Sequence, residues 1–310
     1  MNLKKPVFWD NPKQSIISNL LIPFTLPIIL RNFFTKFIKK EKSTKIKTIC
    51  VGNIYIGGTG KTPLTIKLYE ILNKLGYKVA TAKKYHSNQF DEQILLKKKT
   101  KTIISKSRKI ALTNGINSDY EILIFDDGLQ DSQLDYDLKF VCFKSENWIG
   151  NGQIIPAGPL RENIISLTKF DAVFLNGSSN KLEEIEKTIK KINSKLQIFR
   201  THYNILNNQD FDKNKDYLLF SGIGSPEDFK KILLNNNFKI KNEFIFPDHY
   251  RYNNKDFEKI LNFARMNNLN IITTEKDYVK VPEKFQKNIN YIKIKLNINK
   301  EEDLINLLTK

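Results

Sequence analysis

The chain has 310 residues, 51 of them Lys or Arg and 33 of them Asp or Glu, which gives a formal net charge of +18. This length allows two domains or one large α/β unit, and the positive charge calls for a polyanionic partner or an anionic surface. Arginines are few among the basic residues, which weakens the case for a protein that reads nucleic-acid sequence. The two cysteines, Cys50 and Cys142, lie in apolar runs, which argues against a disulfide framework or a structural zinc site.

The N-terminal part combines apolar and basic residues. Residues 20–30 are apolar but too short to span a bilayer, and Pro23 and Pro27 interrupt them. A basic cluster interleaved with Phe and Ile follows. We therefore expect residues 1–42 to form a helical segment that lies on an anionic membrane surface; the alternative is a helix buried against the domain. The basic cluster consists of Arg31, Lys36, Lys39, Lys40 and Lys42.

Residues 46–63 carry the most specific motif. An apolar run predicts a buried strand, a glycine-rich turn follows, and Lys61 and Thr62 precede an amphipathic helix. This order is that of a P-loop, in which backbone N–H groups and a helix N-terminus surround an anion. Lys61 is expected to contact the β- and γ-phosphates of ATP, and the Thr62 hydroxyl to bind Mg²⁺. The residues expected to bind the nucleotide are Gly57, Gly58, Thr59, Gly60, Lys61, Thr62 and Pro63.

One position of this loop departs from the usual P-loop pattern. Tyr55 stands five residues before Gly60, where that pattern has glycine. We expect Gly57 and Gly58 to make the turn instead, because glycine lets the backbone close around an anion without a Cβ clash. A glycine-rich turn that binds nothing is the alternative.

Alternating apolar runs and helical patterns predict the fold. Runs that are typical of strands recur after the P-loop at 78–81, 122–125, 140–143 and 172–175. Such alternation is typical of an α/β fold with a parallel sheet. A polar stretch predicts a linker, and a second α/β pattern follows it. The expected organisation is a P-loop core lobe (43–206), a linker (207–216) and a smaller α/β lobe that closes a cleft (217–310).

Four further positions are candidates for chemistry. Asp126 and Asp127 end an apolar strand, where P-loop enzymes hold Mg²⁺; a simple turn is the alternative. Arg161 ends a loop rich in Gly and Pro and is expected near phosphate, although a surface ion pair with Glu162 would also explain it. His249 follows a strand of the second lobe and is a candidate general base or its partner, although a lone histidine is more often structural.

These motifs together resemble the tetraacyldisaccharide 4′-kinase family of lipid A synthesis. The resemblance covers nearly the whole chain and includes residues 6–9, 51–63, 126–130, 156–162, 220–226, 246–249 and 274–277. It implies a two-lobed, membrane-associated P-loop kinase at the cytoplasmic face of the inner membrane. The implied reaction transfers the γ-phosphoryl group of ATP, with Mg²⁺, to the 4′-hydroxyl of a tetraacylated glucosamine disaccharide 1-phosphate. No nucleic-acid partner is expected.

The resemblance also implies roles for individual residues. The family has an Asp-Glu pair after its second strand, which Asp91 and Glu92 match, so Asp91 would be the base and His249 its partner. Where family members carry Ser-Arg-Gly-Tyr, this chain has Ala-Lys-Lys-Tyr at 82–85, and Lys83 or Lys84 would substitute for the arginine as a point charge. Further candidate site residues are Gln130, Glu162 and Lys276.

Two rival interpretations remain open at the level of sequence. One is a membrane-bound or filament-forming ATPase with a variant P-loop, but Ile56 occupies the position of the lysine that marks that variant. The other is a basic nucleic-acid-binding protein, for which the sequence offers no recognition motif.

Overall fold

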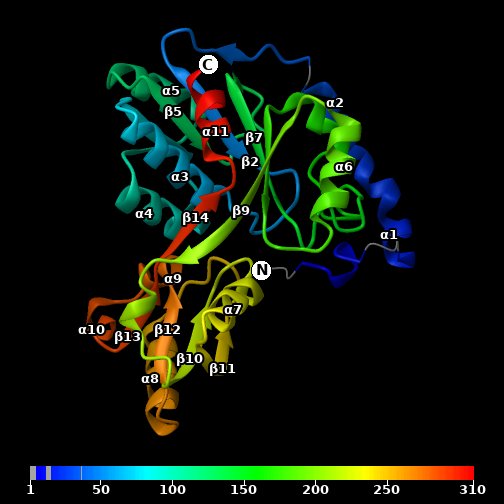
Figure 1. Cartoon of the computed structure of the whole chain (residues 1–310). Coiled ribbons are helices and arrows are strands. Elements are labelled where there is room, and N and C mark those ends of the chain that lie inside the picture. Colours follow the sequence, from blue (N-terminus) through cyan, green and yellow to red (C-terminus); the bar gives the residue numbers. More distant parts are fainter. Residues whose placement is uncertain (1–4, 12–14, 36) are drawn as a thin grey trace.

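The computed structural model describes residues 5–11, 15–35 and 37–310, and these form two lobes joined at a narrow waist (Figure 1). The first lobe contains an eight-stranded sheet in the order β14-β9-β8-β7-β2-β5-β3-β4. All neighbours in it are parallel except β14 and β9, which are antiparallel. Its strands are β2 (Lys47–Gly52), β3 (Val79–Lys84), β4 (Thr102–Ser105), β5 (Ile122–Asp126), β7 (Leu138–Lys144), β8 (Ala172–Asn176), β9 (Gln197–Ile205) and β14 (Ile294–Ile298).

Helices cover both faces of this sheet because successive strand side chains point to opposite sides. Ile49 and Val51 of β2 pack with Leu64 and Leu68 of α3, whereas Cys50 packs on the α5 side. Cys50 and Cys142 are buried free thiols, as predicted. The helices of this lobe are α3 (Lys61–Lys74), α4 (Phe90–Lys99), α5 (Arg108–Asn117), α6 (Leu182–Ile192) and α11 (Glu301–Thr309), with 3₁₀ turns η3 (Ser87–Gln89) and η4 (Ile164–Lys169) and a small pair of strands, β1 (Glu41–Lys42) and β6 (Leu134–Asp135).

The second lobe is a smaller α/β unit built on a four-stranded parallel sheet in the order β11-β10-β12-β13. The connection from β9 contains the turn η5 (Asn208–Asp210), which lies in the predicted linker. The strands of the second lobe are β10 (Asp216–Ser221), β11 (Lys239–Ile245), β12 (Asn270–Thr274) and β13 (Ile289–Ile292). Its helices are α7 (Pro226–Asn235), α8 (Asn254–Met266), α9 (Glu275–Tyr278) and α10 (Glu283–Gln286). The predicted α/β class, with a P-loop-type parallel sheet and a second, smaller lobe, is confirmed.

The end of the chain corrects the predicted boundary of the second lobe. Strand β14 pairs with β9, and α11 packs in the core of the first lobe through Leu304 and Leu308. The second lobe therefore ends near Ile292 rather than at residue 310. The chain leaves one sheet after Ile292 and enters the other at Ile294.

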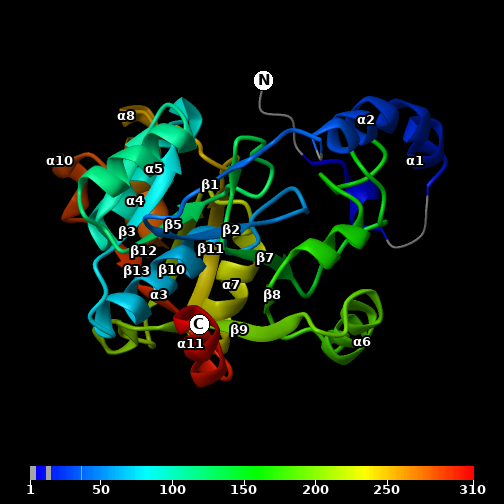
Figure 2. The ribbon, with the colours of Figure 1, turned by 90° about the horizontal axis from the view of Figure 1, so that it is seen from above.

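The N-terminal segment forms η1 (Val7–Trp9), α1 (Ile16–Leu21), η2 (Ile22–Thr25) and α2 (Leu26–Phe34), along the outside of the first lobe and away from α4 and α5 (Figures 1 and 2). Residues 20–30 belong to a longer helical run than the sequence indicated, and that run could cross a membrane by length and composition only. The helical run extends over Ile16–Phe34, and within the described residues it alone is long and apolar enough to cross a membrane. Pro23 and Pro27 do not interrupt it, because each lies in the first turn of a new helical piece, where its missing N–H is not needed.

Candidate active site

The glycine-rich loop leads directly into α3. This helix begins at Lys61, and its N-cap, Gly60, has a left-handed φ of 88°, which glycine adopts at no steric cost. The loop and the first turn of α3 line a cavity of about 550 Å³ that residues of both lobes enclose. All seven residues expected to bind nucleotide, from Gly57 to Pro63, line this cavity. The second lobe approaches the loop closely, because Ser225 Oγ donates to the carbonyl of Gly58 at 3.4 Å.

The two aspartates at the end of β5 lie in different surroundings. Asp126 is 1% exposed and accepts hydrogen bonds from Thr62 Oγ1 at 3.0 Å and from Lys83 Nζ at 2.7 Å. Asp127 lines the cavity, with Lys61 Nζ at 4.0 Å and Arg161 Nη1 at 3.3 Å. Burial alone would raise the pKa of Asp127, but the charges of Lys61 and Arg161 hold it below its usual range. Both carboxylates and the Thr62 hydroxyl thus gather at the start of α3.

Arg161 reaches this end of the cavity from the loop that precedes η4. Its Nη1 donates to Gln130 Oε1 at 3.0 Å as well as to Asp127. Gln130 in turn donates to Glu162 Oε1 at 3.1 Å and to the Asn53 carbonyl at 2.9 Å. The predicted residues Gln130 and Glu162 therefore support Arg161. The surface ion pair that would have explained Arg161 without a site is not the contact seen, because Glu162 bonds to Gln130 and lies 3.8 Å from Lys169.

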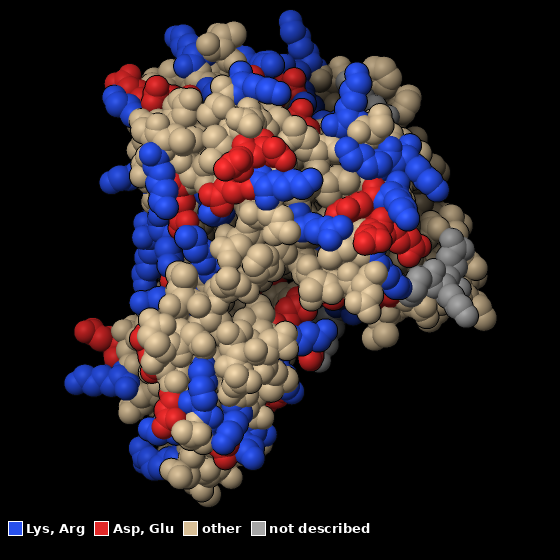
Figure 3. Space-filling view, viewed as in Figure 1, with Lys and Arg blue, Asp and Glu red and all other residues tan. Residues whose placement is uncertain are grey.

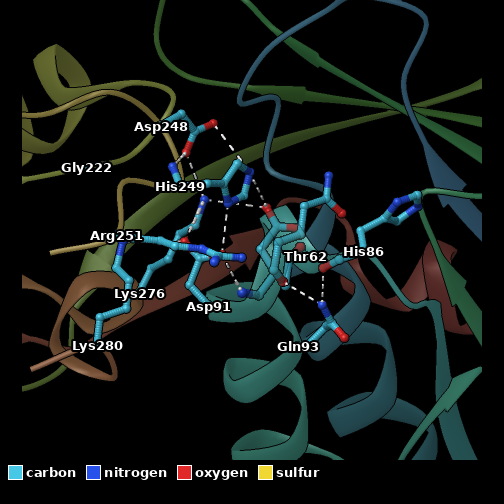
Figure 4. Close-up of polar contacts among 12 residues, drawn as sticks. Thr62, His86, Asp91, Gln93, Gly222, Asp248, His249, Arg251, Lys276 and Lys280 are labelled. Carbon is cyan, nitrogen blue, oxygen red and sulfur yellow. Dashed lines mark hydrogen bonds and ion pairs between the residues drawn. The ribbon is translucent and has the colours of Figure 1, made fainter. Parts of the chain in front are cut away.

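The opposite wall brings together residues from both lobes. Asp91, in the first turn of α4, is 2% exposed, and its Oδ1 lies 2.8 Å from His249 Nδ1 (Figure 4). Lys276 Nζ and Lys280 Nζ lie 3.7 and 3.5 Å from Asp91 Oδ2. Burial would raise the pKa of Asp91, but the hydrogen bond from His249 and the charges of both lysines hold it below its usual range. Because an ionised carboxylate can only accept, His249 Nδ1 carries the proton in this bond.

His249, and not Asp91, lines the cavity. Its Nε2 lies 3.8 Å from Glu92 Oε1 and 3.7 Å from Asp248 Oδ2, and Lys276 bonds to Asp248 at 2.9 Å (Figure 4). His249 and Asp127 both have left-handed backbones, with φ of 59° and 60°. This conformation is uncommon outside glycine and concentrates at functional sites.

Two residues at this wall, Lys280 and Asp248, were not among the site residues predicted from the sequence, and neither was the burial of Lys83. Lys83 is 2% exposed and bridges Asp126 and Glu92 at 2.7 Å each, so the lysine that stands in the altered Ala-Lys-Lys-Tyr run makes a buried ion pair. The charge of Lys83, with that of Lys276, outweighs burial and lowers the pKa of Glu92. Lys280 lies four residues after Lys276, and this spacing is the sequence feature that could have predicted its place at the site.

Comparisons with known proteins show the family of this chain. A family model described as tetraacyldisaccharide-1-P 4′-kinase matches residues 17–84 and 79–310. The tetraacyldisaccharide 4′-kinases of Pelagibacter ubique and Rickettsia felis are 48% and 34% identical over 100% and 99% of this chain, which cover 98% and 96% of those proteins. The crystal structure of LpxK from Aquifex aeolicus in complex with ATP has a TM-score of 0.72 over 95% of this chain and 99% of that one; at 24% identity it supports the fold. The chain belongs to the tetraacyldisaccharide 4′-kinase family.

Proposed function

We propose that this kinase transfers the γ-phosphoryl group of ATP to the 4′-hydroxyl of a tetraacylated glucosamine disaccharide 1-phosphate. The observation that carries the proposal is the cavity itself. One wall holds a P-loop with Lys61, and another holds His249 with Asp91 behind it. Phosphoryl transfer needs positioning and neutralisation of charge more than covalent chemistry by the protein, and these two walls supply both.

The phosphate end would bind the nucleotide and its metal. Lys61 and the N-terminus of α3 would bind phosphate oxygens, and Arg161 would neutralise charge on the transferring group. Thr62, Asp126 and Asp127 offer the oxygen ligands that suit Mg²⁺, which neutralises phosphate charge when bound. No group of three His, Cys, Asp or Glu side chains in the described part of the chain could hold a metal. Mg²⁺ commonly binds one or two carboxylates together with substrate phosphates.

The opposite wall would take the proton of the sugar hydroxyl. A hydroxyl is a poor nucleophile until its proton has an acceptor, and the Asp91–His249 pair provides one. We assign Asp91 as the base and His249 as its partner. His249 and Lys276 line the cavity whereas Asp91 is 2% exposed, so the hydroxyl would have to approach Asp91 past the His249 side chain to come within hydrogen-bond reach of the base. Lys276 and Glu92 complete the charged surroundings of this pair.

The N-terminal segment would hold the enzyme on the cytoplasmic face of the inner membrane. Its outer side exposes large apolar residues: Ile16, Ile17, Leu20, Phe24, Leu26, Phe33, Phe34 and Phe37. Its inner side is polar and buried, since Ser18 is 0% and Thr25 is 5% exposed. A helix that crosses the bilayer would have to leave these contacts, so the segment is proposed to lie in the membrane surface. Lys36, part of the predicted basic cluster, lies outside the described residues.

The proposed reaction is tested with radiolabelled ATP and a disaccharide 1-phosphate acceptor in detergent micelles. We expect transfer by the full chain and a fall of about 10²–10³-fold for Lys61→Ala, because a donor to the transferring group is lost. Absence of labelled lipid product with the wild-type chain would overturn the proposal. Retention on duplex DNA or RNA that falls steeply with salt would favour the nucleic-acid alternative. Against that alternative, Lys and Arg intermingle with Asp and Glu on the face shown in Figure 3.

Docking is tested with vesicles. The full chain should bind vesicles with anionic headgroups better than neutral ones, and salt should weaken the difference. Deletion of residues 1–40 should move the protein from the membrane pellet to the supernatant. Equal partitioning of the full and truncated chains would favour a helix that only packs on the first lobe.

A further inference from the structure

The N-terminal segment is bonded to the loop that carries Arg161. Asn32 Nδ2 of α2 donates to the Arg161 carbonyl at 2.9 Å. On the other side, the Arg161 N–H donates to the carbonyl of Ile54, in the chain that leads from β2 into the P-loop, at 2.6 Å. The backbone of Arg161 is thus fixed between the N-terminal helix and the phosphate-binding loop.

A second bond joins the segment to the phosphate loop itself. Tyr55 stands where the usual P-loop pattern has glycine, and it is 4% exposed. Its hydroxyl donates to Asp10 and accepts from Lys5 Nζ, the latter at 2.7 Å. Tyr55 also forms a β-bridge with Leu160, the residue before Arg161. The departure from the P-loop pattern therefore has a structural partner outside the loop.

Residues 151–157, which precede Arg161 in its loop, also form hydrogen bonds with the N-terminal segment. Ser18 Oγ donates to the Ala157 carbonyl at 2.7 Å, and Trp9 Nε1 donates to the Pro156 carbonyl at 3.0 Å. The backbone N–H of Asn151 donates to the Trp9 carbonyl at 2.9 Å. A Cβ at Gly150 would lie 2.2 Å from the Trp9 carbonyl oxygen, so the two backbones approach as closely as glycine allows.

We propose that the N-terminal segment positions Arg161 and the phosphate loop, with Asn32 and Tyr55 as the positioning residues. This inference rests on the proposed role of Arg161 at the transferring phosphoryl group. Membrane docking needs the apolar side of the segment and makes no use of Asn32, Ser18 or the Tyr55 hydroxyl. Those polar groups face the protein and fix a loop that has little regular structure of its own. The segment thus has one side for the membrane and one for the phosphate site.

The test separates positioning from docking. For Asn32→Ala we expect kcat to fall about three- to tenfold, the range for loss of one hydrogen bond, with the KM for ATP and the binding to anionic vesicles unchanged. Asn193→Ala is the matched control. It removes a longer amide-to-carbonyl bond, from Asn193 Nδ2 to the Leu167 carbonyl at 3.4 Å, and the bond that Asn193 Oδ1 accepts from the Lys195 N–H, both at residues that do not line the cavity. Full turnover of Asn32→Ala, or a loss of turnover that only follows loss of vesicle binding, would overturn the proposal.

A double-mutant cycle identifies Arg161 as the residue through which Asn32 acts. Asn32→Ala should cost nothing further once Arg161 is Ala, because residues that act as a unit are non-additive. Multiplicative losses would overturn the positioning role. Full turnover of Arg161→Ala alone would overturn the proposed role of Arg161 at the phosphoryl group. If Arg161→Ala is inactive but Asn32→Ala is fully active, only the proposed positioning role of Asn32 is overturned. If Asn32→Ala does not fold, Tyr55→Phe, which deletes one hydroxyl, takes its place in the same cycle.

Discussion

Two buried carboxylates behind the walls of the cavity, Asp126 and Asp91, are held by different lobes. Asp126 bonds to Thr62 and Lys83, both of the first lobe. The side-chain partners of Asp91 are His249, Lys276 and Lys280, all of the second lobe. The surroundings of Asp126, at the phosphate end, therefore come from the first lobe alone. The surroundings of Asp91, called here the base end, require the second lobe to be docked on the first. Binding of nucleotide and acceptance of the proton depend on different parts of the fold.

The largest effect is expected at the base end. Asp91→Ala should lower kcat by about 10²–10⁴-fold, the usual contribution of a positioned base. The affinity for ATP should survive, because no partner of Asp126 changes. His249→Ala should cost less, about tenfold, and the double variant should be little worse than Asp91→Ala. Turnover assays and calorimetric ATP titrations measure both quantities. An equal loss of ATP binding in Asp91→Ala would show that the two ends are not separate.

The variant Lys83→Met removes the buried cation at the phosphate end. This change leaves the buried carboxylate of Asp126 without Lys83, the cation that pairs with it, whereas Glu92 keeps Lys276 at 3.5 Å. We expect a loss of about 3–5 kcal/mol in the free energy of unfolding. Lys98→Met, at an exposed position of α4, is the control and should be nearly neutral. Urea unfolding measures the difference. Equal stability of the two variants would mean that Lys83 contributes no more than a surface lysine.

The charge that the second lobe brings to the base end is tested with Lys276→Met. Burial raises the pKa of Asp91 and of Glu92, but hydrogen bonds and charges, including that of Lys276, lower both below their unfolded values of about 3.9 and 4.3. This stabilisation is complete above about pH 5 and is lost as the pH falls through the lowered values. The variant should lose about 1–3 kcal/mol at pH 7. Urea unfolding between pH 7 and 3 should show the difference shrinking below about pH 4; a constant difference would contradict it.

The smallest effect is expected at a partly exposed ion pair between the lobes, which lines the cavity. Lys99 of α4 pairs with Glu275 of α9 at 2.6 Å. A partly exposed pair of this kind contributes about 0.2–1 kcal/mol, so Lys99→Met should change kcat by about fivefold at most and leave the affinity for ATP unchanged. A loss as large as that of His249→Ala would show that this pair, and not the Asp91 cluster, holds the second lobe in place.

The phosphate end was largely predictable from sequence because its signals are local. The strand, the glycine turn and the start of α3 at Lys61 occupy one short stretch, and Asp126 and Asp127 end the strand beside it. The base end was not predictable in this way. Asp91 looks like an ordinary acidic residue in the first turn of a helix, which the helix dipole favours. Its partner His249 is 158 residues away, and only the family resemblance connected them.

Three other structural features were also not predicted from the sequence. The return of β14 to the first sheet depends on pairing with β9, a contact that hydrophobic periodicity does not encode. The buried bridge of Lys83 joins carboxylates 9 and 43 residues away, and lysine usually lies at the surface. The helical run through Pro23 and Pro27 was hidden because a proline that begins a helix and one that breaks it look the same in a short apolar stretch.

The first lobe contains the early part of the chain and also its last two elements, β14 and α11. Leu296, Leu304 and Leu308 are at most 5% exposed and share a core with Leu64 of the P-loop helix. During synthesis the whole of the second lobe leaves the ribosome before these residues do, so it can fold while the ATP-binding sheet still lacks an edge strand and a covering helix. A truncation before Ile294 would therefore damage the nucleotide site at the other end of the sequence and leave the second lobe nearly whole.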